Sequence, residues 1–247
     1  MDERCPTCGF AEEDYRGRFD APFLAGAVGT RAALIFDGLA AGVRPAGFAT
    51  PVDLEETLSL AVGAGRLHEA VHTCHEVAAG AARLALGEGY GARGRIAALH
   101  SSRGGVPKLP VEEAEISWRG IVGDRQREYK HHGHAWQALC LWSSEVIATL
   151  RAEGHPAGPG LAGENLLCSG LDWARLRSGL RLSLGPEVVA ELTAPAAPCK
   201  KIKGSFADGN FRRLSHSSHP GSSRWYAAVL RPGRLRVGDA VGVGLFG

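Results

Sequence analysis

A glycine-rich stretch at residues 86–94, LGEGYGARG, divides this chain into two parts of different texture. Four glycines in nine residues favour a linker over a helix, because glycine loses the most backbone freedom on folding. The residues before the stretch carry helix signals, whereas those after it form short apolar runs separated by Gly, Pro, Asp and Ser. We therefore predict a helical domain at residues 1–90 and a mainly β domain at residues 91–247.

Two helices are predicted in the first part. Residues 20–41 space their apolar side chains as an amphipathic helix does. The second helix has a clearer beginning, because Thr50 serves as the N-cap, a proline follows at the first helical position, and Asp53 approximates a capping box. We expect this helix over residues 51–86, with a bend at residues 63–65.

The second part reads as short strands interrupted by one helix. The helix is expected at residues 135–154, where a glycine stops it. The fold class that follows is α+β and mainly β. Strands are predicted at residues 94–102, 114–123, 180–185, 187–194 and 234–246.

The composition excludes several classes of protein. A net charge of +2 over 247 residues is a poor footprint for nucleic acid or an anionic membrane. No apolar run approaches the roughly 18 to 20 residues that a membrane span needs, and the beginning is too polar for a secretory signal. We therefore expect a cytoplasmic protein. Six scattered cysteines are too few for a disulfide framework, which leaves metal binding, catalysis or burial as their uses.

One cysteine has the surroundings of a functional thiol. Cys199 lies directly before Lys200 and Lys201, with Lys203 close by. Cationic neighbours favour a thiolate, which is the form that binds a soft metal or carries sulfur. The alternative is a small packed thiol, because a free cysteine is often only a core residue.

Five stretches of the second part occur in an order that resembles the MOSC family, the C-terminal domain of molybdenum cofactor sulfurases. The resemblance covers about residues 92–245 and implies a strand-rich, barrel-like domain. In some members its pocket holds the molybdenum cofactor, with a family cysteine bonded to the metal or carrying sulfur, and Cys199 matches that position. The stretches are GIVGDRQ at 120–126, HHGHAWQAL at 131–139, GENLLCSGLDWARLRSGLRLSLG at 163–185, APCKKI at 197–202 and SSRWYAAVLRPGRLRVGD at 222–239.

The same resemblance implies two groups of site residues around the cysteine. The alternatives are solvated surface residues for the cations, turn or core positions for Asp124 and His132, and a turn for Glu164 and Asn165. The implied catalytic residues are Cys199, Lys201, Glu164 and Asn165. The implied cofactor-binding residues are Lys108, Asp124, His132, Arg224, Tyr226 and Arg103.

The chain also departs from the family pattern after His132. Many members that reduce N-hydroxylated bases have two glycines there and then an Asp-Arg pair. This chain has His134 in place of the second glycine, and Trp136 and Gln137 where the pair falls. The missing arginine argues for a changed substrate or a site that no longer binds the full cofactor.

The N-terminal part carries the residues of a zinc site. Cys5 and Cys8 form a Cys-x-x-Cys pair, and the stretch RLHEAVHTCHEV places three histidines along one helical face. Two cysteines and two helical side chains would complete a tetrahedral site, with His75 and either His72 or Cys74. The alternative is a polar helix face without a metal.

These features, CPTCGF and CHEV, resemble the beginning of DinB-like four-helix proteins over residues 1–88. Only two long helices fit before the glycine-rich stretch. Such a half bundle would dock on the second domain or pair with a second copy, which predicts a possible homodimer through the N-terminal helices.

The leading hypothesis is a MOSC-type enzyme that binds the molybdenum cofactor through Cys199 and reduces an N-oxygenated small substrate, with electrons from a separate donor. The first alternative is a metal-free sulfur carrier or transferase, which receives a persulfide on Cys199 from a cysteine desulfurase. The second is a non-enzymatic, metal-stabilised binding module. Cys140 and Cys168 lie in apolar runs and are expected to be packed core thiols.

Overall fold

The computed structural model describes residues 32, 36, 48, 50–87, 90–126, 132 and 134–244. The chain divides into two compact units. The first contains residues 1–90 with 177–181 and 244–247, and the second contains residues 91–176 and 182–243. None of the described helices is both long and apolar enough to cross a membrane.

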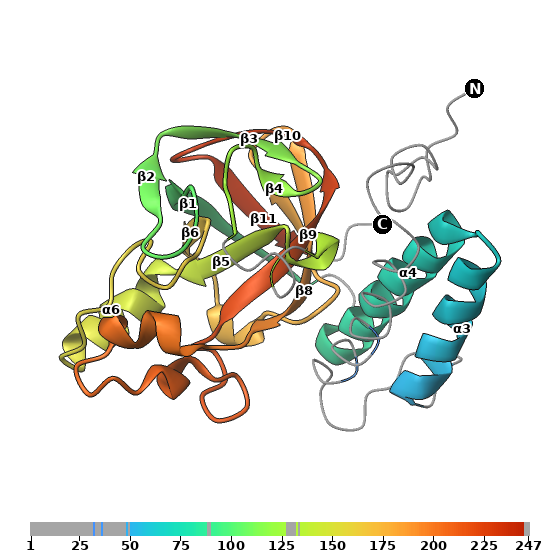
Figure 1. Ribbon diagram of the computed structural model, residues 1–247, viewed down its shortest axis with the longest axis horizontal. Coiled ribbons are helices and arrows are strands. Elements are labelled where there is room, and N and C mark those ends of the chain that lie inside the picture. Colours follow the sequence, from blue (N-terminus) through green and yellow to red (C-terminus); the bar gives the residue numbers. More distant parts are fainter. Residues whose placement is uncertain are drawn as a thin grey trace. The chain divides into compact units, whose positions relative to one another are not determined.

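Within residues 50–87, the described part of the first unit contains helices α3 (Pro51–Gly63) and α4 (Leu67–Leu86), which are drawn side by side in Figure 1. Helix α3 begins with the predicted capping box: the Thr50 amide donates to Asp53 Oδ2 at 2.8 Å, and the Asp53 amide donates to Thr50 Oγ1 at 3.3 Å. Helix α4 follows after a short turn. The single helix predicted over this region is therefore two, because the backbone at Gly65 takes a positive φ of 75° that ends the first helix.

Small and aliphatic side chains pack the two helices together. Leu54 and Leu58 of α3 are fully buried and belong to one cluster with Ala70, Cys74 and other residues of α4. The small side chains of Ala70 and Ala78 on α4 leave room for Leu54 and Leu58 of α3, so the two helices pack closely. The helix predicted at residues 20–41 lies almost wholly outside the described residues, although Ala32 and Phe36 are helical and contact this cluster.

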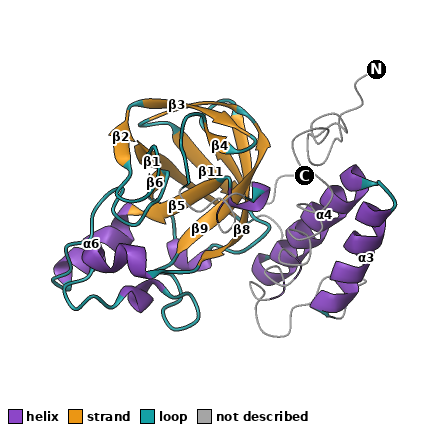
Figure 2. Cartoon of the chain, in the orientation of Figure 1, coloured by secondary structure: helices purple, strands orange, loops and turns teal. Residues whose placement is uncertain are grey.

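The second unit contains a closed barrel, and Figure 2 draws its strands in orange together with those of a smaller sheet. The strand order of the barrel is β11-β7-β8-β9-β5-β6-β1, and β11 also pairs with β1, which closes the sheet. The short strand β2 (Leu109–Val111) adds to β1 outside this ring. This architecture confirms the predicted mainly β, α+β class. The barrel strands are β1 (Gly91–Ser101), β5 (Leu139–Ser143), β6 (Leu166–Ser169), β7 (Arg181–Leu184), β8 (Val188–Ala196), β9 (Arg224–Arg231) and β11 (Ala240–Gly244).

A second, three-stranded sheet stands beside the barrel in the order β10-β3-β4. It consists of β10 (Gly233–Arg236), β3 (Glu113–Ser117) and β4 (Gly120–Ile121). The run predicted as one strand at 114–123 is thus a hairpin, because Gly120, with a φ of 95°, reverses the chain.

The helix predicted at residues 135–154 is correct only in its second half. Residues 135–137 form a single 3₁₀ turn, and β5 follows at Leu139–Ser143. Every residue of β5 is buried, and the strand lies between β9 and β6, so a run without a polar face suits a central strand. Helix α6 (Ser144–Ala152) then begins where Ser143 Oγ accepts hydrogen bonds from the amides of Glu145 and Val146.

Candidate functional site

The ends of several barrel strands and their loops surround one pocket of about 110 Å³. Residues from all five family-like stretches line it, together with the loop that follows β1. Arg103, Asp124 and Glu164 are not among the described residues of its wall. The predicted residues that line it are Lys108, His132, Asn165, Cys199, Lys201, Arg224 and Tyr226.

Cys199 lies at a fixed point of the backbone, three residues after β8 ends. A 3₁₀ segment begins immediately afterwards at Lys200–Ser205, and the Ile202 amide donates to the Cys199 carbonyl at 3.1 Å. Ile202 is buried and anchors this turn, whereas Cys199 is half-buried and Lys201 is exposed. The thiol therefore faces a ligand-accessible space with a cationic side chain in the same wall.

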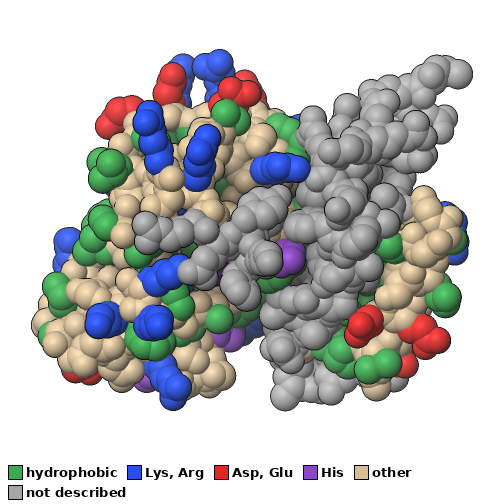
Figure 3. Space-filling model, viewed as in Figure 1, with side chains coloured by type: hydrophobic (Ala, Val, Ile, Leu, Met, Phe, Trp, Pro, Cys, Tyr) green, Lys and Arg blue, Asp and Glu red, His purple; other side chains and the backbone are tan. Residues whose placement is uncertain are grey.

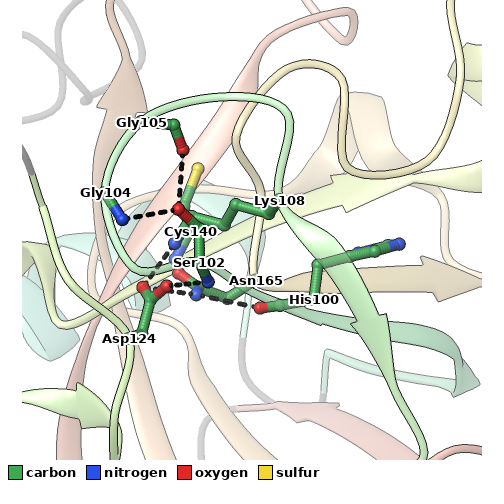
Figure 4. Close-up of polar contacts among 8 residues, drawn as sticks. All are labelled: His100, Ser102, Gly104, Gly105, Lys108, Asp124, Cys140 and Asn165. Atoms are coloured by element: carbon green, nitrogen blue, oxygen red, sulfur yellow. Dashed lines mark hydrogen bonds and ion pairs between the residues drawn. The ribbon is translucent and has the colours of Figure 1, made fainter.

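Asp124 is the centre of a hydrogen-bond network behind the pocket, drawn in Figure 4. It accepts from the Ser102 amide at 2.7 Å, from Lys108 Nζ at 2.5 Å and from Asn165 Nδ2 at 3.0 Å. The Lys108 and Asp124 side chains are only 9% and 7% exposed, so this is a buried ion pair. Its position indicates that Asp124 orients Lys108 and Asn165, whereas the resemblance implied a direct contact with the cofactor.

Asn165 joins three elements through its amide. Its Nδ2 also donates to the His100 carbonyl at 3.3 Å, and its Oδ1 accepts from the Cys140 amide at 3.2 Å. The Asn165 amide in turn donates to the Cys140 carbonyl at 2.7 Å. Because these bonds occupy the side chain, Asn165 shapes the pocket wall at the ends of β1, β5 and β6.

Arg224 ties two loops together at the beginning of β9. Its guanidinium donates to the carbonyl of Ala162, before β6, and to that of Ala197 at 3.4 Å, just before Cys199. The side chain is 6% exposed, and its Nε has no partner among the described residues. Arg224 thus fixes the loops that border Cys199 and keeps one unused donor beside the pocket.

Glu164 is fully buried behind the loop that precedes β6. Its Oε1 accepts from the Gly160 amide at 2.5 Å and lies 4.0 Å from His100 Nδ1. Burial raises the pKa of Glu164 to about 6, against the opposing effect of the Gly160 amide and the Arg224 charge. Burial, and secondarily the Lys108 charge, lowers the pKa of His100. The buried Glu164 and His100 side chains thus stabilise the loop that precedes β6.

Aromatic side chains form the wall near His132. The Tyr226 hydroxyl lies 3.4 Å from His132 Nδ1, and Trp136 meets the Tyr226 ring edge-on with centroids 5.9 Å apart. His134 stacks on Trp136 at 5.6 Å. Burial raises the pKa of Tyr226 to about 12, so its hydroxyl stays protonated well above neutral pH.

Several residues of the wall were not predicted from the sequence, among them Cys140 and Gln137. Cys140 was expected to be a core thiol; it is buried, yet it lines the pocket. It lies directly across from Tyr226 in the β5–β9 pairing, and cross-strand partners face the same side of a sheet. This placement was hidden because the segment was predicted to be helical. Gln137, noted only as a departure from the family pattern, also lines the pocket.

The remaining predicted residues lie elsewhere. Arg103 is exposed in the loop after β1. Cys5 and Cys8 lie outside the described residues, and His72 and His75 lie on α4. Within the described part of the chain, no three His, Cys, Asp or Glu side chains form a group that could hold a metal ion. The zinc site thus stays a prediction.

The charged side chains among the described residues of the pocket wall are all basic. Lys108 is paired with Asp124, and the exposed side chains of Lys201 and Arg125 add positive charge to the wall. On the face drawn in Figure 3, the basic side chains are scattered among apolar and acidic ones. This local, modest charge suits a small ligand.

Comparison with known proteins gives the family. Residues 128–242 match the family model described as the MOSC domain. A Gibberella moniliformis protein called "Reductase" is 27% identical over 126 residues, which are 49% of this chain and 22% of that protein. The chain therefore spans about a fifth of that curated relative.

Comparison with solved structures gives the following matches. A crystal structure of a hypothetical protein matches with a TM-score of 0.50 at 23% identity, covering 63% of this chain and 69% of that one. The structure of YiiM from Geobacillus stearothermophilus matches with a TM-score of 0.48 at 20% identity, covering 61% and 74% of the two chains. From the family match and the closed barrel, we conclude that this chain contains a MOSC domain at residues 128–242.

Proposed function

We propose that this protein binds the molybdenum cofactor in the pocket beside Cys199 and reduces an N-oxygenated small substrate. The observation that carries the proposal is the convergence of two separate stretches of the MOSC pattern on one pocket, with Cys199 and Lys201 from residues 197–202 and Arg224 and Tyr226 from residues 222–239. The relative called "Reductase" supports a reductive activity in general terms.

The donor groups of the pocket fit such a cofactor. Cys199 supplies a thiol, the ligand type that a soft, high-valent metal prefers. Lys201 and the unpartnered Nε–H of Arg224 can bind anionic groups of the cofactor. The Lys108 ammonium already bonds Asp124, so Lys108 adds positive charge to the pocket wall but no two-donor contact for an anion.

The cofactor, when bound, would supply the two-electron redox chemistry. Reduction of an N-hydroxylated substrate takes up two electrons and two protons, breaks the N–O bond and releases one water. A separate electron-donor protein must supply the electrons. The chain itself would orient the substrate through the Tyr226 hydroxyl and His132, which lie 3.4 Å apart at the pocket wall.

The pocket volume favours one alternative function. A whole drug-sized ligand usually occupies a pocket of roughly 300–1,000 Å³, whereas this one measures about 110 Å³. A sulfur carrier needs much less room. In that case the Cys199 thiolate would attack the outer sulfur of a persulfide on a cysteine desulfurase, take up that sulfur and release the desulfurase thiolate.

Metal and sulfur analysis of the same preparations separates the two functions. The full chain is produced in a host that makes the molybdenum cofactor, as wild type, Cys199→Ser and Cys140→Ser. The proposal predicts molybdenum in the wild type and in Cys140→Ser, but not in Cys199→Ser. Molybdenum-free wild type with a persulfide on Cys199, found by mass spectrometry, supports the carrier function and overturns the reductase.

A further inference from the structure

Gln137 places an unused amide in the pocket wall. It ends the 3₁₀ turn Ala135–Gln137, lines the pocket and is only 7% exposed. Its side-chain oxygen, Oε1, is buried and has no hydrogen-bond partner among the residues that the structure describes. A second amide of the wall, that of Asn165, is by contrast bonded on both its oxygen and its nitrogen. Gln137 therefore holds free hydrogen-bonding capacity that Asn165 lacks.

The backbone holds Gln137 in this position. Its amide donates to the His134 carbonyl at 2.8 Å, and Thr193 Oγ1 of β8 donates to the Trp136 carbonyl at 2.6 Å. A turn held at two points fixes the direction in which the side chain leaves the backbone. The amide is thus presented by a rigid element, as a recognition group needs to be.

An unpartnered buried acceptor is costly and calls for an explanation. Leaving such a group unsatisfied costs about 1–3 kcal/mol, and most buried polar side chains are hydrogen-bonded. A ligand that donates to Gln137 would remove that cost on binding. The amide then contributes to affinity for ligands with a donor and not for ligands without one.

We propose that Gln137 is a specificity-determining residue that selects an uncharged ligand group carrying a hydrogen-bond donor, such as a carboxamide, over a carboxylate. A carboxylate has acceptors only and cannot satisfy Oε1. The inference rests on the proposed function in one respect, namely that the substrate enters the pocket beside Cys199.

The charges around the pocket are consistent with this preference. The Lys108 ammonium is bonded to Asp124 at 2.5 Å, and two nitrogens of the Arg224 guanidinium donate to backbone carbonyls, so that only its Nε–H is without a partner among the described residues and no two-donor fork is left for a carboxylate. The other cations of the wall, Lys201 and Arg125, are exposed, so solvent screens them. Turning the Gln137 amide over would offer an NH₂ group to a carboxylate, but without the positive charge and fork of an arginine.

Paired probes test this selection on the full chain. Benzamide and benzoate share a ring and differ in the charge and donor of the head group, and ligand-observed NMR titration gives both dissociation constants. We expect wild type to bind benzamide about 10-fold more tightly, a difference of about 1.4 kcal/mol. Gln137→Met should abolish this preference, and Gln137→Arg should invert it. Asn210→Leu, which removes an exposed amide outside the pocket wall, should leave it intact.

Thermal unfolding guards against a merely structural effect. Since Gln137 Oε1 has no protein partner among the described residues, Gln137→Met should leave the Tm unchanged or raise it. An unchanged probe ratio in Gln137→Met, a wild-type preference for benzoate, or no binding of either probe overturns the inference. If one of these three results is found while molybdenum retention still depends on Cys199, the proposed function holds and only the role of Gln137 is wrong. A Gln137-dependent probe ratio without molybdenum retention leaves the inference standing without the proposed function.

Discussion

Replacing Asp124 with asparagine removes the negative charge that holds the pocket wall together. The Lys108 ammonium, 9% exposed, would lose the carboxylate that lies 2.5 Å away. The carboxylate also accepts from the Ser102 amide and from Asn165 Nδ2, so the three groups that surround Asp124 are all donors. An asparagine amide would turn one of its two polar atoms into a fourth donor.

The expected loss is large on the scale of protein stability. Breaking a buried ion pair by removing one partner costs about 3–5 kcal/mol, because the other charge is left uncompensated. Both side chains are nearly inaccessible, so solvent screening does not reduce this figure much. A domain of this size has a stability of roughly 5–15 kcal/mol. Asp124→Asn should therefore unfold at a clearly lower denaturant concentration.

Urea unfolding of the full chain measures the effect, with fluorescence of Trp142 and Trp225, both buried in the barrel unit, as the probe. The matched control is Glu113→Gln, which breaks the exposed pair with Arg236, where the side chains are 56% and 69% exposed. That pair should contribute less than about 1 kcal/mol.

A second variant keeps this prediction testable if Asp124→Asn does not fold. Adding Lys108→Met removes the stranded charge, so the double variant should be more stable than Asp124→Asn alone. A loss in Asp124→Asn no larger than that in Glu113→Gln would refute the reasoning. So would a double variant less stable than Asp124→Asn, because it would show that Lys108 does not depend on Asp124.

Three further results are expected. In native protein, iodoacetamide should label the half-buried Cys199 well before the buried Cys140, because burial raises the pKa of the Cys140 thiol. Mass spectrometry measures both labelling rates, and equal rates would contradict the described burial. Burial raises the pKa of Glu164 from 4.5 to about 6, so the folded state prefers the protonated acid, and the free energy of unfolding falls by about 2 kcal/mol as the pH rises from 4.5 to 6. Glu164→Gln should remove this part of the pH dependence of urea unfolding. An unchanged profile would show that Glu164 does not titrate in this window. Gly160→Ala should lower the free energy of unfolding by about 2 kcal/mol more than Gly209→Ala in the same assay. Both glycines have a positive φ, but only at Gly160 would the new Cβ lie 2.3 Å from a backbone oxygen. Equal losses of stability would mean that the loop at Gly160 shifts to make room for the Cβ.

Local signals predicted much of the fold correctly. The capping box at Thr50 and the glycine-rich stretch depend on neighbouring residues alone, and both mark real boundaries of helices. The segment at 139–143 was mistaken for helix because its apolar run is compatible with either structure. Only its pairing with β9 and β6 makes it a strand, and that pairing joins residues far apart in the chain.

The candidate site shows the same division. The motif order pointed to Cys199, Arg224 and Tyr226, which do line one pocket. The sequence could not show that Asp124 lies behind the wall, because this depends on its contact with Lys108 across a loop. Nor could it show that Cys140 faces the pocket, since its direction follows from strand pairing.

The central claim is that the Cys199 thiol holds a molybdenum-bearing cofactor in this pocket. The most direct test is the molybdenum content per chain of protein purified from a cofactor-producing host, by inductively coupled plasma mass spectrometry, for wild type and Cys199→Ser. The account predicts nearly one molybdenum per wild-type chain and almost none in the variant. Equal molybdenum in both proteins, or a molybdenum-free wild type, would contradict it.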